Sequence, residues 1–269
     1  MVSENTTFPP GFVSIVGAGP GAIDLITLRG RAALGEAQVV IHDALANTDL
    51  LHFCPSGVEV HDVGKRCNNH RTTQEQIHGL MIAGARAGRR VVRLKGGDPA
   101  VFARLSEEAA ALEAAGVPFE IIPGVTAACA TAAALGVSLT SRDLAPGTVF
   151  VTGHECASRA AANPVDWAAL AKLNMTLCVY MGVRELPAIA EKLLAAGMST
   201  ETPLTIVSNV SRLNESVRNG MLADAAAFST EDIDQPAMIF IGAVVGAGRS
   251  FEIATAASSA LGPAQTRVL

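Results

Sequence analysis

Glycine residues gather in one short stretch near the start of the sequence, in a pattern suited to holding a ligand. The segment Gly17-Ala18-Gly19-Pro20-Gly21-Ala22 follows an apolar run and fits the spacing G-x-G-x-x-[G/A]. That spacing is typical of a loop that places a dinucleotide pyrophosphate at the N-terminus of a helix. Taken alone the pattern is weak, because tight turns between a strand and a helix also collect glycines.

Two features of this loop argue against a phosphate ligand. Pro20-Gly21 separates the glycine turn from the expected helix start at Asp24, whose carboxylate would cap the N–H groups of Leu25–Thr27. A carboxylate at that point would repel a phosphate. The loop is therefore interpreted either as a compact cradle for a ligand without phosphate or as a plain turn, and the residue types leave both interpretations open.

Two later loops combine glycine with a polar group and an expected helix start. In the stretch RLKGGDP, two glycines allow close backbone approach and Asp98 offers a carboxylate. Asp98 is equally suited to capping a helix whose first residue is Pro99. In the stretch IIPGVTAA, the N–H groups near Thr126 and Ala127 would be available to an anionic group.

The elements that must position these loops follow from the pattern of apolar residues. Apolar, β-rich runs alternate with Ala-, Leu- and Glu-rich segments such as Gln74–Ala87 and Phe102–Ala115, which predicts an α/β fold. Strands are expected at Val13–Val16, Val39–His42, Val58–Val63, Arg90–Leu94, Phe119–Ile122, Val149–Thr152, Leu177–Tyr180, Pro203–Val207 and Ala237–Ile241. Ligands in such folds bind beyond the carboxyl ends of strands, which is where all three loops lie.

A break rich in Gly and Pro at Arg142–Gly147 divides the expected strands into two groups. We therefore predict an N-terminal α/β lobe over residues 12–143 and a C-terminal α/β lobe over residues 147–246, with a cleft between them. Residues 1–11 and 247–269 are interpreted as tails.

Composition excludes several classes of protein. A net charge of -5 with a single Trp and a single Tyr disfavours nucleic-acid binding. The mean hydropathy of +0.35 reflects abundant Ala, Val and Leu, and no apolar segment is long enough to span a bilayer, so no membrane contact is expected. The first residues lack the features of a signal or transit peptide, which favours a cytoplasmic location.

The cysteines and histidines form no recognisable site. The five cysteines are scattered and have no C-x-x-C spacing, which favours reduced thiols over a disulfide framework. The six histidines form no H-E-x-x-H motif and no tight cluster with cysteine. No metal is therefore expected, whereas an anionic small molecule stays compatible with the sequence where positive charge gathers locally.

The glycine loops, in this order, resemble those of the tetrapyrrole methylase family, in particular its uroporphyrinogen-III C-methyltransferases. The resemblance covers residues 12 to about 246 and rests on the ordered set VGAGPG, VVIHDAL, DVGKR, VVRLKGGDPAVF, IIPGVTAA, LTSRD, VTGH, VYMG and PAMIFIGAVV. It implies a two-lobed α/β fold, each lobe a mixed sheet flanked by helices. It also implies that S-adenosyl-L-methionine binds in the cleft between the lobes and leaves as S-adenosyl-L-homocysteine.

The resemblance assigns roles to individual residues. Asp43 would be the catalytic base, and Lys65 a proton donor or substrate anchor. The cofactor site would comprise Pro20, Gly96, Gly97, Asp98, Val101, Thr126, Ala127, Met181, Val210 and Ala237. Cations for the carboxylates of the substrate would be Lys65, Arg66, Arg104, Arg142 and Arg184. Without the resemblance, Asp43 and Lys65 would be interpreted as solvated charges and Met181 as a core residue.

The implied reaction is the transfer of two methyl groups to pyrrole carbons of uroporphyrinogen III, which gives precorrin-2, by a homodimer. The protein would place the reactants in line and take up the released proton. Ala44, Ala103, Leu105 and Ser141 depart from the family pattern near the expected substrate side. A methylase of another tetrapyrrole or corrin precursor, or a cofactor-binding protein without activity, therefore stays open. The additional reactions of a multifunctional sirohaem synthase, dehydrogenation and iron insertion, are not expected.

Overall fold

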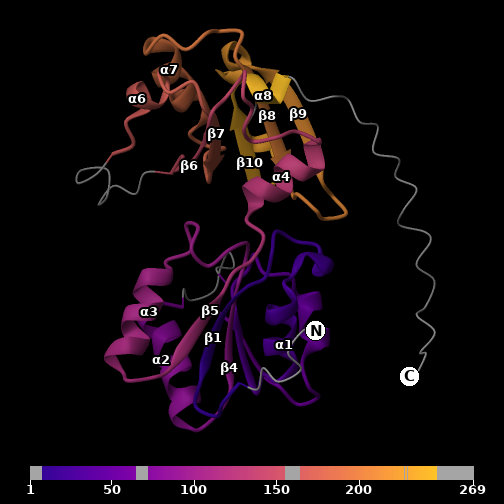
Figure 1. Cartoon of the computed structure of the whole chain (residues 1–269), viewed down its shortest axis with the longest axis vertical. Coiled ribbons are helices and arrows are strands. Elements are labelled where there is room, and N and C mark those ends of the chain that lie inside the picture. Colours follow the sequence, from indigo (N-terminus) through magenta and orange to yellow (C-terminus); the bar gives the residue numbers. More distant parts are fainter. Residues whose placement is uncertain (1–7, 65–71, 155–163, 227, 229, 247–269) are drawn as a thin grey trace, which may run out of the picture.

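The fold consists of two lobes, one above the other in Figure 1. The computed structural model describes residues 8–64, 72–154, 164–226, 228 and 230–246. Within these residues each lobe contains a five-stranded sheet. The predicted two-lobed α/β fold is thus confirmed.

The first sheet is parallel throughout, with the strand order β3-β2-β4-β1-β5. Its strands are β1 (Val13–Gly17), β2 (Val39–His42), β3 (Glu59–Asp62), β4 (Val91–Lys95) and β5 (Phe119–Ile122). The prediction of a mixed sheet is wrong for this lobe. Parallel strands need crossover connections, and helical segments in the described connections provide them.

Helical segments cover both faces of the first sheet (Figure 1). They are α1 (Leu28–Gly35) and η2 (Thr48–Phe53) on one face, and α2 (Gln74–Arg86) and α3 (Leu105–Ala114) on the other. Because side chains alternate along a strand, Ile15 of β1 packs in the same core as Met81 of α2, whereas Val16 packs with Leu34 of α1.

The start of α1 differs from the prediction. Asp24 lies within a short 3-10 helix, η1 (Ile23–Leu25), instead of preceding a helix. Ile26 and Thr27 then take up extended backbone, so α1 begins only at Leu28. Thr27 Oγ1 accepts a hydrogen bond from Gly30 N at 3.1 Å and is the cap in place of Asp24.

The predicted helix start at Asp98 is also wrong. Asp98 Oδ1 accepts a hydrogen bond from Ala100 N at 2.8 Å within a turn, and α3 begins at Leu105. Phe102 and Arg104 have φ angles of 51° and 56°. This left-handed backbone is incompatible with a continuous α-helix, so the segment between the glycine loop and α3 is bent.

The second sheet is mixed, with the strand order β6-β7-β10-β8-β9. Its strands are β6 (Thr148–Thr152), β7 (Thr176–Tyr180), β8 (Pro203–Ser208), β9 (Ser216–Met221) and β10 (Ala237–Ile241). β6 and β7 are parallel, whereas β10 is antiparallel to both of its neighbours. Every predicted strand is present, but β9 was missed because it is a mostly exposed edge strand without an apolar pattern.

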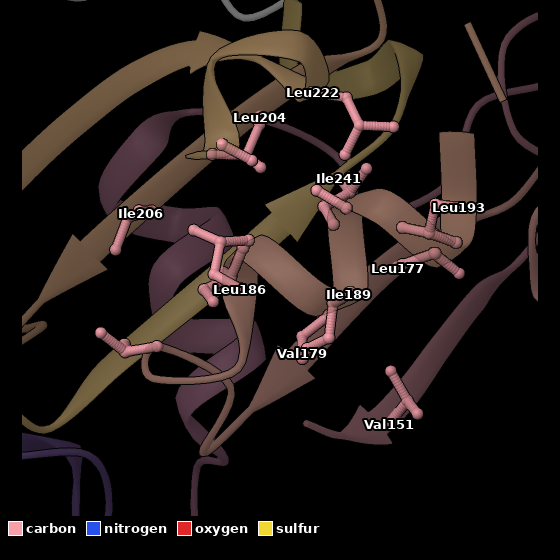
Figure 2. Packing of buried hydrophobic residues seen from close by; sticks show 14 of the residues in the cluster. Val151, Leu177, Val179, Leu186, Ile189, Leu193, Leu204, Ile206, Leu222 and Ile241 are labelled. Carbon is pink, nitrogen blue, oxygen red and sulfur yellow. The ribbon is translucent and has the colours of Figure 1, made fainter. Parts of the chain in front are cut away.

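Helices also cover both faces of the second sheet. Figure 2 shows Leu186, Ile189 and Leu193 packed with strand residues such as Leu177 and Ile241. The elements on this face are α6 (Trp167–Leu170), α7 (Leu186–Ala195) and η3 (Leu222–Ala226). η4 (Thr230–Asp232) precedes β10, and α8 (Ala243–Gly246) follows it and packs Val245 on the opposite face. None of the described helices has the length and apolar character needed to cross a bilayer.

α4 (Ala127–Leu135) lies on the opposite face of the second sheet, where Ala128 and Ala132 pack against Phe240 of β10. By sequence this helix falls within the predicted N-terminal lobe, yet it packs on the second sheet. The chain therefore passes from one sheet to the other in the segment between β5 and α4. The predicted boundary at Arg142–Gly147 lies C-terminal to this passage.

Candidate active site

The three loops at the carboxyl ends of β1, β4 and β5 contact one another. Ala18 N donates a hydrogen bond to Lys95 O at 2.7 Å. Gly19 and Gly97 exchange two backbone hydrogen bonds of 3.2 and 2.7 Å. Asp98 Oδ2 accepts a hydrogen bond from Gly124 N at 2.9 Å. The loop after β4 is thus joined to both of the others.

Close packing at this junction requires glycine. A Cβ atom on Gly124 would lie 2.3 Å from Gly97 O, and one on Gly17 would lie 2.6 Å from Gly124 Cα. Gly97 differs from these two residues, because it has a φ of +68° and a Cβ there would meet nothing within 4 Å. The junction is therefore tightly packed at Gly17 and Gly124 and has open space beside Gly97.

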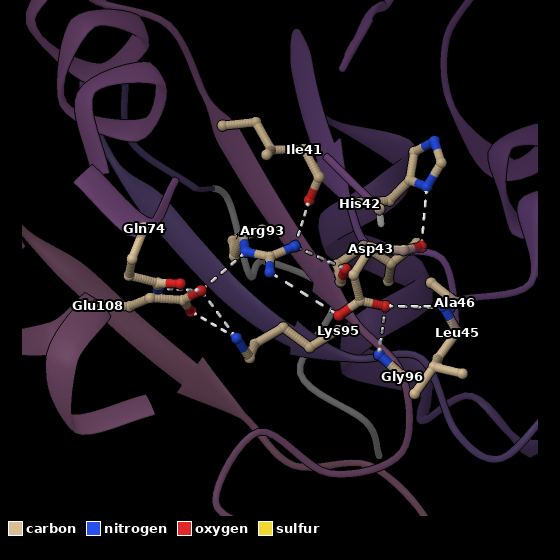
Figure 3. A network of polar contacts seen from close by, with 12 residues as sticks. Ile41, His42, Asp43, Leu45, Ala46, Gln74, Arg93, Lys95, Gly96 and Glu108 are labelled. Atoms are coloured by element: carbon tan, nitrogen blue, oxygen red, sulfur yellow. Dashed lines mark hydrogen bonds and ion pairs between the residues drawn. The ribbon is translucent and has the colours of Figure 1, made fainter. Parts of the chain in front are cut away.

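Asp43 follows β2 and reaches the same junction (Figure 3). Its Oδ1 accepts hydrogen bonds from the N–H groups of Leu45, Ala46 and Gly96 at 3.2, 3.1 and 3.3 Å. Its Oδ2 lies 3.8 Å from Arg93 Nη2, and the side chain is 30% exposed. One carboxylate oxygen is thus fixed by the backbone, while the other faces a cation.

A network of buried charges lies beside Asp43 (Figure 3). Alternation along β4 puts Arg93 and Lys95 on the face that carries Val91, toward α2 and α3. Glu108 of α3 accepts hydrogen bonds from Arg93 Nε at 3.0 Å and from Lys95 Nζ at 2.8 Å. These three side chains are at most 4% exposed. The sequence signal for this network was the pair of cations within the apolar strand VVRLK, which the sequence analysis did not single out.

The ionisation of Lys95 reflects this setting. Desolvation lowers the pKa of Lys95 from its ordinary value, and the nearby Arg93 acts in the same direction. Glu108 and Asp43 oppose this shift by favouring the charged ammonium. The network therefore consists of two cations, Arg93 and Lys95, and two carboxylates, Asp43 and Glu108.

Tyr180, at the end of β7, connects the second lobe to the loop junction. Its Oη forms a hydrogen bond of 2.7 Å with Thr126 Oγ1 and accepts another from Ala128 N at 3.3 Å. Its ring lies 4.8 Å, between centroids, from the ring of Phe102. Burial raises the pKa of Tyr180, so the hydroxyl stays protonated at neutral pH.

The loop after β8 makes a second connection between the lobes. Ala22 N donates a hydrogen bond to Ser211 Oγ at 3.0 Å, and Arg212 Nη2 donates one to Leu45 O at 2.8 Å. Ser211 has a φ of 63°. The loops after β1 and β2 are therefore held by residues of the second lobe that the sequence analysis did not single out.

The predicted cofactor-binding residues of the first lobe lie close together. Pro20 is in the loop after β1, Gly96, Gly97, Asp98 and Val101 are in the loop after β4, and Thr126 and Ala127 are at the start of α4. The contacts above join these three segments. Both carboxylate oxygens of Asp98 accept backbone hydrogen bonds, so its visible role is to hold two loops together.

The predicted cofactor-binding residues of the second lobe have different surroundings. Met181 follows Tyr180, is 54% exposed and has a φ of 53°, so it is not a core residue. Val210 is 7% exposed and packs with Ala130 and Val207. Its side chain therefore belongs to the core. Ala237 begins β10 and pairs with Ser208 of β8.

The remaining predicted residues are less closely connected. Lys65 and Arg66 lie outside the described residues. Arg104 donates hydrogen bonds of 2.8 and 2.6 Å to Glu107, and this pairing raises the pKa of Arg104. Arg142 and Arg184 are exposed, and no hydrogen bond or ion pair between described residues joins their side chains to the three loops. The described part of the chain also holds no cluster of His, Cys, Asp or Glu suited to a metal ion.

Comparison with known sequences identifies relatives of this chain. A family model described as tetrapyrrole (corrin/porphyrin) methylases matches residues 13–226. A siroheme synthase of Neisseria meningitidis serogroup C (strain 053442) is 44% identical over 236 residues, which are 88% of this chain and 48% of that protein. The chain spans about half the length of the curated relatives it matches.

Solved structures agree with the family match. A cobalt precorrin-4 methyltransferase has a TM-score of 0.78 and 30% identity, covering 87% of this chain and 96% of that one. The uroporphyrin-III C-methyltransferase of Thermus thermophilus complexed with S-adenyl homocysteine has a TM-score of 0.74 and 37% identity, covering 87% of this chain and 99% of that one. This chain belongs to the tetrapyrrole (corrin/porphyrin) methylase family.

Proposed function

We propose that this chain is an S-adenosylmethionine-dependent uroporphyrinogen-III C-methyltransferase, which methylates two ring carbons and forms precorrin-2. The observation that carries the proposal is the junction of three glycine-containing loops beside Asp43. The 37% identity to the Thermus thermophilus enzyme, over 99% of its chain, supports this choice of substrate.

The chemical groups at the junction, which are open backbone, a helix start and an apolar side chain, are of the types that S-adenosylmethionine needs. When bound, this molecule supplies a methyl group activated by a sulfonium, and it carries no phosphate. The backbone beside Gly97 is open, and the side chain of Thr126 does not cap the start of α4, where Ala128 N donates to Tyr180 Oη. Met181 adds an exposed apolar side chain from the second lobe. We assign cofactor binding to Pro20, Gly96, Gly97, Asp98, Val101, Thr126, Ala127, Met181, Val210 and Ala237, with Val210 acting through its backbone.

Asp43 is the proposed base. A methyl group that enters a pyrrole carbon brings a positive charge with it, and the macrocycle returns to neutrality when a proton leaves. Three backbone N–H groups hold Oδ1 of Asp43, so its Oδ2 has a fixed position from which to accept that proton. Lys65 is proposed as a proton donor or substrate anchor, although it lies outside the described residues.

The carboxylates of uroporphyrinogen III require cations on the protein. Arg104 is proposed to bind one of them by exchanging Glu107 for a substrate carboxylate, since the planar guanidinium forms the same paired hydrogen bonds with either. The ring of Phe102, two residues earlier, is 43% exposed and offers an apolar surface to a pyrrole ring. Arg66, Arg142 and Arg184 complete the proposed set.

A second candidate is a methylase of a later corrin precursor. It is favoured by the TM-score of 0.78 to a cobalt precorrin-4 methyltransferase. Ala44, Ala103, Leu105 and Ser141, which depart from the pattern of the uroporphyrinogen enzymes, are compatible with a different macrocycle.

An anaerobic assay of the purified protein tests the proposal. Uroporphyrinogen III and S-adenosylmethionine are supplied, and the product is followed by absorbance and mass, with S-adenosylhomocysteine affinity measured separately by calorimetry. Addition of two methyl groups supports the proposal. Turnover only with a later corrin precursor supports the second candidate, cofactor binding without turnover indicates a binding protein, and absence of cofactor binding contradicts all three.

The homodimer and the cytoplasmic location stay predictions. Sedimentation of the purified protein tests the first of them, and a monomer with full activity in the assay above would contradict it.

A further inference from the structure

The buried charges beside Asp43 have no part in the reaction as proposed so far. Glu108 is fully buried, and Arg93 and Lys95 are each 3% exposed. We propose that Glu108 is a positioning residue for methyl transfer, which acts through Arg93 and Lys95 to hold Asp43 in place against the loop after β4. This inference rests on the proposed function.

Arg93 links Glu108 to Asp43. Its Nε donates to Glu108 Oε1 at 3.0 Å, and its Nη2 lies 3.8 Å from Asp43 Oδ2. Its Nη1 donates at 3.2 Å to the carbonyl oxygens of Ile41 and Leu94, which belong to two neighbouring strands. Because the guanidinium is rigid and planar, holding one edge on Glu108 sets the direction of the edge that faces Asp43.

Lys95 links Glu108 to the backbone of the glycine loops. Its Nζ lies 2.8 Å from both carboxylate oxygens of Glu108. The carbonyl of Lys95 accepts the hydrogen bond from Ala18, and the N–H of the next residue, Gly96, donates to Asp43 Oδ1. The side chain of Lys95 therefore anchors the point at which the β1 loop, the β4 loop and Asp43 meet.

Stability alone does not account for these charges. A buried ion pair stabilises a fold no better than apolar side chains of similar volume, so packing of α3 on the sheet has no need of it. The aliphatic residues around it, such as Leu112 and Val91, already provide that packing. What the charges add is a fixed orientation of the Arg93 guanidinium, which faces the proposed base Asp43.

The test compares Glu108→Gln with Glu113→Gln in the methyltransferase assay. In Glu108→Gln the amide oxygen can still accept from Arg93, but the amide NH2 then faces the ammonium of Lys95. We expect kcat to fall about tenfold while KM and the affinity for S-adenosylhomocysteine stay near their wild-type values. Glu113 is exposed on the same helix, so Glu113→Gln should leave all three quantities unchanged.

A double-mutant cycle separates positioning from a general loss of structure. If Glu108 acts through Asp43, Glu108→Gln should change single-turnover rates less than about twofold in an Asp43→Asn background, against about tenfold in the wild type. Equal factors in both backgrounds would overturn the inference. Should Glu108→Gln fail to fold, Arg93→Lys takes its place in the cycle, because it keeps the charge and removes the planar link.

Wild-type activity distinguishes this inference from the function on which it rests. An active wild type with an unchanged kcat in Glu108→Gln overturns the positioning role alone. A wild type that binds S-adenosylhomocysteine but methylates no tetrapyrrole overturns the proposed function, and the inference with it.

Discussion

The two sheets have the same number of described strands but different interiors. The first sheet buries Arg93 and Lys95 on β4 and packs them against Glu108. The core between the second sheet and α7 consists of apolar residues, with Leu177, Ile239 and Leu193 among its members. Buried charge is thus concentrated in the lobe that carries Asp43, while the second lobe provides an apolar frame.

Strand direction explains how both lobes still reach one site. All strands of the first sheet are parallel, so their loops emerge at one edge. In the second sheet β7 and β8 are both antiparallel to β10, so the ends of β7 and β8 and the start of β10 share an edge. Tyr180, the loop that carries Val210, and Ala237 lie at that edge.

The largest expected effect is on turnover, from Asp43→Asn in the charged lobe. Removal of the proposed base should lower kcat by about 100-fold or more, with the affinity for S-adenosylhomocysteine nearly unchanged. Asp49→Asn is the matched control, because Asp49 is an exposed carboxylate on the nearby η2. Full activity of Asp43→Asn in single-turnover assays would exclude Asp43 as the base. The buried charges of the first lobe would then have no link to the reaction that distinguishes this lobe from the second.

The next effect comes from Gly124→Ala at the loop junction. The new Cβ would collide with the carbonyl of Gly97, so we expect a loss of about 3 kcal/mol in the free energy of unfolding and weaker binding of S-adenosylhomocysteine. The control is Gly79→Ala on α2, where a Cβ meets nothing within 4 Å. That change should stabilise the protein by up to about 1 kcal/mol, since alanine favours helix over glycine. Similar denaturation curves for the two variants would contradict the packing argument.

The sequence predicts the fold well where apolar periodicity carries it. Each of the expected strands is present, because buried strands such as β1 and β10 are runs of apolar residues. It fails at β9, whose exposed side chains leave no such pattern. It also fails at the helix starts after Asp24 and Asp98, although both aspartates are good caps in isolation. Extended backbone at Ile26 and left-handed backbone at Phe102 and Arg104 delay the start of each helix.

The site is less predictable from the sequence than the fold. The glycine loops and Asp43 are recognisable from their motifs, and hydrogen bonds join them in the structure, while their roles stay predictions. Glu108 and Tyr180 were missed because each owes its place to partners distant in sequence, Arg93 and Thr126. Single-residue patterns do not encode such pairings. The mapping of Val210 to the cofactor site stays a prediction, and only its buried side chain was unexpected.

A smaller effect should appear at alkaline pH, from the apolar interior of the second lobe. Burial raises the pKa of Cys178 from 9.0 to about 11, so the folded protein keeps a proton that the unfolded chain loses. The stability due to the neutral thiol is complete below pH 9 and is lost as the pH rises through 11. Over that window the wild type should lose up to about 2 kcal/mol relative to Cys178→Ala.

Urea unfolding at several pH values measures this difference. Cys129→Ala is the control, because Cys129 is exposed on α4 and its removal should leave the pH profile of the wild type unchanged. A constant difference between the wild type and Cys178→Ala from pH 8 to pH 11 would show that the thiol is not held in its neutral form.

The smallest expected effect is that of Tyr180→Phe, which tests the connection between the lobes. Phenylalanine keeps the ring beside Phe102 and removes the hydroxyl that binds Thr126 and Ala128. One net hydrogen bond is worth about 1 kcal/mol, which corresponds to about a fivefold loss of affinity for S-adenosylhomocysteine if the bond holds α4 in its binding position. Adding Thr126→Val should then cost little more, because the two hydroxyls share one bond and the proposed contact of Thr126 with the cofactor is through its backbone. If instead each substitution weakens binding by its full factor in the double variant, Thr126 acts on the cofactor independently, and the second lobe contributes its apolar side chains alone.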